Sequence, residues 1–281
     1  MTIDTNARIS NGTLCRLRAQ WWAAAGVCLL ILFVGYLVFN QGRFDPSAVQ
    51  WVLQSTVIII YVLVLLRYGL DWNYHPDQKV LRSTLGYGTW LTIIRGALIA
   101  VLAGYLFQPW PESKFFPGRL SWAPGLLYIT ASILDYIDGR LARTCQHETR
   151  LGAFLDINFD ALGLLIAPLV AFWYGQLPVA YLSVGLAYYI FLTGIRLRKK
   201  FSMSVFEPGP WRGARVIAGF QMGFVGIVLL PVVKPPVTTL AAYVVMIPLL
   251  AGFVRDWMIV CGHWKAGSFI RFFRLRCSNP D

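Results

Sequence analysis

Eight long apolar runs divide this sequence, and they restrict it to folds in which several helices lie in a lipid bilayer. A helix needs about 20 apolar residues to cross the hydrocarbon core, and each run reaches or nearly reaches that length. Only 14% of the 281 residues are charged, whereas soluble domains carry about 25% charged residues. We therefore predict an all-α integral membrane protein with about eight transmembrane helices. The runs are 21–39, 50–66, 87–107, 121–137, 153–174, 177–195, 214–233 and 236–254.

The candidate chemistry is confined to the middle of the chain. Residues 1–86 are predicted to be an N-terminal extension with two transmembrane helices, residues 87–257 a six-helix catalytic core, and residues 258–281 a basic cytoplasmic tail. The first run follows basic residues, as a secretory signal does, but it is too long for a signal core and no small-residue cleavage site follows it. We therefore interpret it as an uncleaved membrane anchor.

The positive charge of the chain is distributed in a way that predicts its orientation. The formal net charge is +12, and most of the basic residues fall on one side if the N-terminus is cytoplasmic and the chain crosses eight times. The other side then holds only Arg43, Lys114, Arg119 and Lys234. This asymmetry follows the positive-inside rule, so both termini are predicted to be cytoplasmic. The charge is explained by topology and anionic lipid headgroups, and we expect no nucleic-acid partner.

Four aspartates lie at the facing ends of the fourth and fifth apolar runs. Asp135 and Asp138 are three residues apart, so they share one face of a helix. Asp156 and Asp160 are four apart and share a face as well. A short cytoplasmic turn joins the two helices, so the two pairs are predicted to face each other across a helix–helix seam. Small residues on the same helices, such as Gly163, allow a backbone or a flat ligand to come close.

Four carboxylates near a bilayer need a counter-charge, because each costs about 2.5–3.5 kcal/mol at mid-membrane on insertion scales. Oxygen ligands without nearby His or Cys select hard cations such as Mg²⁺, Mn²⁺ or Ca²⁺. Two such ions can hold a diphosphate and stabilise a displacement at phosphorus. Arg143, with Arg140 and Arg150, is positioned to contact phosphate oxygens.

Two other interpretations of the aspartates stay open at this point. One is a structural salt-bridge network with Arg140, Arg143 and Arg150. The other is a proton or cation pathway in a transporter, because intramembrane acids mark such pathways too. The five cysteines and three histidines show no spacing typical of a zinc site or of paired disulfides.

The motif resembles the signature of the CDP-alcohol phosphotransferases at every one of its fixed positions. It runs Asp135-x2-Asp138-Gly139-x2-Ala142-Arg143-x8-Gly152-x3-Asp156-x3-Asp160. Eight fixed positions at fixed spacing make this a specific signal. The segment from Trp90 to Arg95 also resembles the start of that family's first core helix. The resemblance covers roughly residues 87–257 and leaves the first two helices outside it.

The resemblance implies transfer of a phosphatidyl or related phospho-alcohol group from a CDP-linked lipid, usually CDP-diacylglycerol, to an acceptor alcohol with release of CMP. It implies two Mg²⁺ or Mn²⁺ ions as cofactors and Asp160 as the general base. Relatives of this kind are often homodimers, so a homodimer is one expected arrangement. The implied metal ligands are Asp135, Asp138, Asp156 and Asp160, and the implied CDP-binding residues are Gly139, Ala142, Arg143 and Gly152.

The acceptor is predicted from a basic segment between the sixth and seventh runs. Arg196 and Arg215 lie near helix ends there and are candidates for binding a phosphate on the acceptor, such as glycerol-3-phosphate or an inositol phosphate. The alternative interpretation is that these two arginines only reflect the excess of basic residues in cytoplasmic segments. The stretch Thr149–Asp156 resembles bacterial phosphatidylglycerophosphate synthases, but the residues after it depart from their usual pattern. A CDP-aminoalcohol transferase acting on diacylglycerol is the alternative enzyme.

Overall fold

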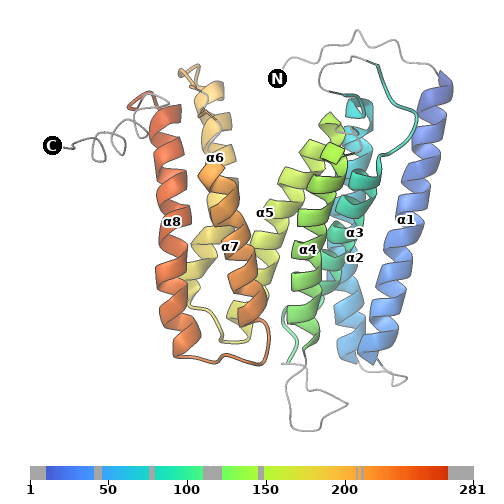
Figure 1. Ribbon diagram of the computed structural model, residues 1–281. Helices are drawn as coiled ribbons and strands as arrows, with labels where there is room; N and C mark the ends of the chain where they lie inside the picture. The colour runs from blue at the N-terminus through green and yellow to red at the C-terminus, as the bar shows by residue number, and fades with distance from the viewer. Residues whose placement is uncertain are drawn as a thin grey trace.

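The described part of this computed structural model contains eight α-helices and two short 3₁₀ helices (Figure 1). The structure describes residues 11–40, 46–75, 80–109, 122–144, 149–206, 208–209 and 212–264, and no strand is present in these ranges. The helices are α1 (Asn11–Asn40), α2 (Pro46–Gly69), α3 (Tyr87–Ala103), α4 (Ala123–Thr144), α5 (Arg150–Trp173), α6 (Leu182–Lys200), α7 (Arg212–Val228) and α8 (Val237–Val260). The 3₁₀ turns are η1 (Leu70–Trp72) and η2 (Val179–Tyr181).

The helices run up and down in sequence order, with α5 between two groups (Figure 1). Helices α1 to α4 lie on one side of α5, and α6 to α8 lie on the other. Helix α5 contacts α2 and α3 in the first group and α6 and α7 in the second. Because successive helices alternate in direction, α4 ends and α5 begins at the same end of the bundle. We call this end, marked by Thr144 and Arg150, the motif end.

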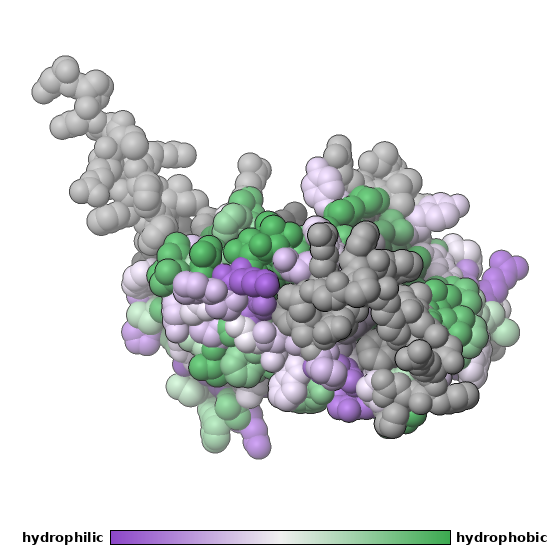
Figure 2. Space-filling view, turned by 90° about the horizontal axis from the view of Figure 1, so that it is seen from below, coloured by the Kyte–Doolittle hydropathy of each residue, from purple (hydrophilic) through white to green (hydrophobic). Residues whose placement is uncertain are grey.

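The predicted all-helical membrane fold is confirmed. Five described helices are long and apolar enough to cross a bilayer, in the ranges 12–37, 47–72, 150–173, 179–200 and 237–260. Three shorter apolar helices cover 87–103, 123–137 and 216–228. Seen from the end opposite the motif end, the described surface shows only small groups of hydrophilic residues beside hydrophobic ones (Figure 2).

Several helices extend past the apolar runs that predict them. Helix α4 continues to Thr144 and α6 to Lys200, although both end in polar residues. Polar and charged residues are compatible with a helix once it leaves the hydrocarbon, so hydropathy underestimates helix length there. The consequence for α4 is that the whole first half of the aspartate motif is helical.

Helices α5 and α6 approach each other closely at a glycine. A Cβ atom on Gly185 would lie 2.6 Å from the carbonyl oxygen of Leu164. This carbonyl cannot be paired in the usual way within α5, because the residue four positions on is Pro168, which has no N–H group. The backbone of α6 therefore packs against a carbonyl that lacks its usual helical N–H donor.

Candidate functional site

Three of the four motif aspartates meet between α4 and α5. Asp135 lies on α4, and Asp156 and Asp160 lie one turn apart on α5. Each offers one carboxylate oxygen, and these three oxygens all lie within 4.8 Å of one another. The side chains are only partly exposed, at 29% for Asp135, 43% for Asp156 and 34% for Asp160. The predicted facing of Asp135 toward Asp156 and Asp160 is therefore present, whereas the side chain of Asp138 lies outside the described residues.

A buried arginine from α3 contacts all three carboxylates. The side chain of Arg95 is 2% exposed and forms an ion pair with Asp135. Its Nη2 lies 3.0 Å from Oδ1 of Asp156, and its Nη1 lies 3.1 Å from Oδ1 of Asp160. Nη2 also donates to the backbone carbonyl of Asp156 at 3.2 Å. Arg95 thus supplies the positive charge next to the cluster.

Sequence reasoning did not identify Arg95 as a partner of the aspartates. The salt-bridge network that it kept as an alternative used Arg140, Arg143 and Arg150, because those residues lie in the same segment of the chain. The signal that points to Arg95 is its place inside an otherwise apolar run, since an intramembrane arginine almost always has a partner.

The cluster lies inside the bundle rather than in a loop. An α-helix rises 1.5 Å per residue, so Asp156 is roughly 9 Å and Asp160 roughly 15 Å along α5 from its first residue. Thr149 caps this helix, because its side-chain oxygen accepts a hydrogen bond from the N–H of Gly152 at 3.0 Å. The cap fixes where α5 begins and hence the depth of both carboxylates.

The donor set fits a divalent cation. Oxygen ligands lie about 2.0–2.6 Å from Mg²⁺ or Ca²⁺, so two ligands on opposite sides of one ion are about 4–5 Å apart. The spread of 4.8 Å among the three carboxylate oxygens lies within that range. With Arg95 included, the four side chains carry two net negative charges when all three carboxylates are ionised. One divalent cation would neutralise that charge.

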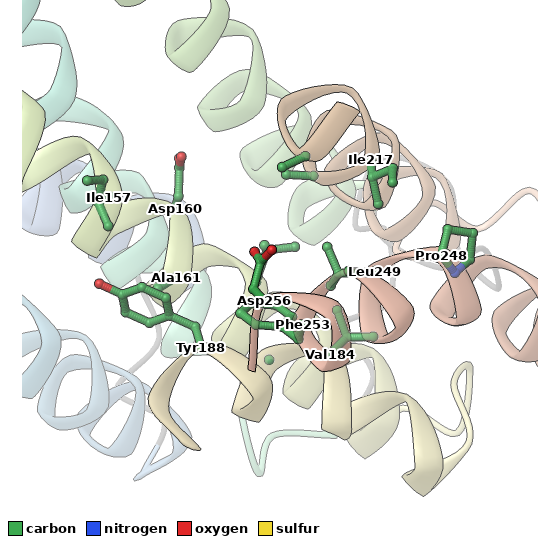
Figure 3. Close-up of a pocket in the computed structure, with 15 residues that line it drawn as sticks. Ile157, Asp160, Ala161, Val184, Tyr188, Ile217, Pro248, Leu249, Phe253 and Asp256 are labelled. Carbon is green, nitrogen blue, oxygen red and sulfur yellow. The ribbon is translucent and has the colours of Figure 1, made fainter. Parts of the chain in front are cut away.

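An apolar cavity adjoins the cluster and shares Asp160 with it (Figure 3). Its volume is about 340 Å³, and α5, α6, α7 and α8 form its walls. Leu164, Val184, Ile217, Leu249 and Phe253 are among the apolar residues that line it. A small set of polar groups on a largely apolar wall is typical of a site that binds an amphipathic ligand.

The polar groups of the cavity come from three different helices. Asp160 lies on α5, Tyr188 on α6 and Asp256 on α8, and Figure 3 shows all three around the same space. Arg255 donates from Nη2 to Oδ1 of Asp256 at 2.8 Å and from Nε to the same oxygen at 3.1 Å. Sequence reasoning missed this pair because it joins the apolar run to the basic tail and belongs to no motif.

Of the remaining predicted site residues, the structure describes Arg196, Gly152 and Gly139. Arg196 is exposed near the end of α6, roughly two turns after Tyr188. Gly152 lies in the first turn of α5, where a Cβ atom would be 3.3 Å from Oγ1 of Thr149 and 3.5 Å from Oγ1 of Thr89. Gly139 lies on α4. The side chains of Asp138, Ala142, Arg143 and Arg215 are outside the described residues, although all four lie on helices.

Among the described residues, Arg150 contacts Tyr74 and forms no ion pair with an aspartate of the motif. Its guanidinium carbon lies 5.3 Å from the centre of the Tyr74 ring, and its Nη1 lies 3.4 Å from the Tyr74 hydroxyl. The salt-bridge network considered from the sequence therefore has Arg95, not Arg150, as its described cation.

The sequence of this region matches a known protein family. The family model of the CDP-alcohol phosphatidyltransferases matches residues 87–267, which include α3 to α8 and every position of the aspartate motif. The chain belongs to the CDP-alcohol phosphatidyltransferase family. The resemblance seen in the sequence is confirmed.

Several similar curated proteins carry the name CDP-diacylglycerol–glycerol-3-phosphate 3-phosphatidyltransferase. The one from Cereibacter sphaeroides is 28% identical over 163 residues, which are 56% of this chain and 65% of the relative. Those from Sodalis glossinidius and Yersinia enterocolitica are 37% and 38% identical over 106 residues, which are 34% of this chain and 52% of each relative. The chain thus spans about half to two thirds of these relatives. No solved structure matches it.

Proposed function

We propose that this membrane protein transfers a phosphatidyl group from a CDP-linked lipid, CDP-diacylglycerol, to the hydroxyl group of an acceptor alcohol. The observation that carries the proposal is the meeting of Asp135, Asp156 and Asp160 beside an apolar cavity. The carboxylates can hold hard cations, which bind a diphosphate. The apolar cavity can hold the chains of a lipid. Membership in the family and the names of the similar proteins support the same reaction.

The reaction forms one bond and breaks one bond at phosphorus. The acceptor oxygen bonds to the β-phosphorus, the bond from that phosphorus to the CMP oxygen breaks, and CMP leaves. Asp160 accepts the proton of the acceptor hydroxyl. Its carboxylate suits this role because it belongs both to the acidic cluster and to the cavity wall. Proton transfer by a positioned side chain contributes about 10²–10⁴-fold to a rate.

The four motif aspartates would hold two Mg²⁺ or Mn²⁺ ions. When bound, these ions neutralise charge on the diphosphate and on the departing CMP. Arg95 assists by holding the carboxylates of Asp156 and Asp160 in place through its contacts of 3.0 and 3.1 Å. Gly139, Ala142, Arg143 and Gly152 would line the CDP pocket, because small residues admit a flat base and arginine binds phosphate.

The acceptor would enter from the motif end. Arg196 lies on α6 beyond Tyr188, and Arg215 lies one residue after the cavity residue Ala214. Two arginines at that position suit an acceptor that carries a phosphate, such as glycerol-3-phosphate or an inositol phosphate. This assignment agrees with the acceptor named for the similar proteins.

The distribution of basic residues supports a cytoplasmic motif end. Arg196, Arg198, Lys199 and Lys200 close α6 at that end, as the positive-inside rule requires of cytoplasmic segments. We further propose residues 87–257 as the catalytic core and residues 1–86 as an extension, a division that the family match over 87–267 supports. A homodimer stays a prediction.

The proposed reaction is tested by measuring CMP release from CDP-diacylglycerol by the purified chain in lipid–detergent micelles. Glycerol-3-phosphate, inositol phosphate, inositol and glycerol are compared as acceptors, each with and without Mg²⁺ or Mn²⁺. We expect metal-dependent CMP release with a phosphorylated acceptor. A parallel arm with CDP-choline and diacylglycerol identifies the aminoalcohol alternative. No CMP in any arm would contradict the proposal and favour a cation pathway.

A further inference from the structure

The segment that joins α2 to α3 binds to the start of α5. We call the described residues of this segment, 70–75 and 80–85, the connector. The backbone carbonyl of Tyr74 accepts a hydrogen bond from the N–H of Arg150 at 3.0 Å. That N–H is one of the first four amides of α5, which have no partner within the helix. The Tyr74 ring also lies under the Arg150 guanidinium, 5.3 Å from its carbon atom.

The connector is held in shape by a buried asparagine. The side-chain amide of Asn73 donates to the carbonyls of Arg82 and Thr84, both at 3.0 Å, and its backbone carbonyl accepts from the N–H of Arg82 at 2.8 Å. Asn73 is fully buried. The N–H of Leu85 donates to the Gln20 side chain of α1 at 2.7 Å. Hydrogen bonds within the connector and to α1 therefore hold the backbone on which Tyr74 lies.

A second contact fixes the same turn of α5 from the side. The ring of Trp72 meets that of Phe154 edge to face, with centroids 5.0 Å apart, and Tyr68 meets Trp72 at 5.2 Å. Gly69 lies so close to Leu151 that a Cβ atom would be 2.6 Å from its Cδ1. Aromatic pairs of this geometry contribute about 0.5–1.5 kcal/mol beyond burial, so residues 150–154 are held on two sides.

We propose that the connector positions the first turns of α5 for the nucleotide part of the donor, with Tyr74 and Arg150 as its positioning residues. The inference rests on the proposed function. The held turn contains Gly152, proposed to line the CDP pocket, and precedes Asp156 by one turn. The N-terminal extension, which lies outside the matched family region, is therefore part of the catalytic unit rather than a separate anchor.

The test measures donor and acceptor KM separately in the full-length chain. Tyr74→Ala removes the ring from beneath Arg150, and we expect the KM for CDP-diacylglycerol to rise about tenfold, which corresponds to about 1.4 kcal/mol. The acceptor KM should change less than about twofold, since the acceptor is proposed to bind elsewhere. Tyr74→Phe keeps the ring and should stay close to wild type. Tyr243→Ala, which removes a tyrosine from α8, is the matched control.

A second variant tests whether Tyr74 acts through Arg150. Arg150→Gln alone should raise the donor KM as well, and the double variant with Tyr74→Ala should have a donor KM no higher than that of the more impaired single variant. Full additivity of the two effects would overturn the inference, because it would mean that the two residues act independently. An equal rise of donor and acceptor KM in Tyr74→Ala would overturn it too, as it would indicate general loss of structure.

Hydrogen exchange provides a readout that does not depend on activity. The amides of residues 150–153 should exchange faster in Tyr74→Ala than in wild type, while those at the other end of α5 stay unchanged. No CMP release by the wild-type chain would contradict the proposed function itself. An active Tyr74→Ala variant with an unchanged donor KM and unchanged exchange would overturn only this inference.

Discussion

Arg95 brings one positive charge to three carboxylates and does so from a helix far from them in the sequence. Its side chain is almost fully buried, while Asp135, Asp156 and Asp160 are partly exposed. Removing one partner of a buried ion pair costs about 3–5 kcal/mol, because the remaining charges lose their compensation. Partial exposure of the carboxylates reduces this cost, since water screens them.

We predict that Arg95→Ala lowers the thermal midpoint in detergent and makes the protein more dependent on metal for stability. The free energy of unfolding should fall by about 2–3 kcal/mol without divalent ions. Mn²⁺ should then raise the midpoint by more in the variant than in wild type, because the cation takes over charge compensation. Arg67→Ala, which changes an exposed arginine at the end of α2, is the control. Equal Mn²⁺ effects in all three proteins would contradict the prediction.

Asp160→Asn tests the proposed base with almost no change in side-chain volume. The amide cannot accept the acceptor proton as a carboxylate does, so CMP release should fall at least about 100-fold. Binding of the CDP-lipid should persist, because Asp135 and Asp156 still offer their oxygens. Equilibrium binding of the donor and turnover are measured on the same preparation. Asp71→Asn, on the surface of η1, is the matched control, and full activity of Asp160→Asn would remove this residue as the base.

The helices themselves illustrate which parts of the site a sequence reveals. The facing of Asp135 toward Asp156 and Asp160 was predictable, because spacings of three and four fix a helix face and a short turn fixes the neighbour. Arg95 was not, because helical spacing says nothing about which distant helix packs beside the motif. The same holds for Asp256, which reaches the cavity from α8. Hydropathy predicted which segments form helices, but it did not predict where those helices end.

The contact between α5 and α6 is predicted to be sensitive to a single methyl group. Gly185→Ala would place a Cβ atom 2.6 Å from the Leu164 carbonyl oxygen, so the helices must separate. Overpacking of this kind costs about 1–3 kcal/mol, and the thermal midpoint in detergent should fall. Gly219→Ala on α7 is the control, because nothing lies within 4 Å of its added Cβ atom. Alanine favours helices, so this variant should be unchanged or slightly stabilised.

The whole molecule gathers its functional groups toward one end of an up-and-down bundle. Helix α4 ends, α5 begins and α6 ends at the motif end (Figure 1). The four basic residues that close α6 lie there as well. The positive-inside rule then predicts that the bundle lies in the membrane with its motif end on the cytoplasmic side.

We predict that the turn after α6 is cytoplasmic and the turn before α8 is on the opposite side. Ser202→Cys and Lys234→Cys are both exposed positions for labelling in a background without native cysteines. A membrane-impermeant maleimide should label Ser202→Cys only from the cytoplasmic side and Lys234→Cys only from the other side. Labelling of both from one side would contradict an up-and-down arrangement of α7, and the reversed pattern would contradict the orientation.

The Leu164 carbonyl on α5, which lacks its usual N–H donor because residue 168 is a proline, has a consequence for biosynthesis. In hydrocarbon, a backbone group without a partner costs several kcal/mol. Glycine C–H groups are weak donors, and those of Gly185 are brought to this carbonyl only when α6 arrives. Helix α5 is therefore costly to release alone into lipid from the insertion machinery. We expect it to wait there until the following helix has been synthesised, so that the two enter the bilayer together as a hairpin.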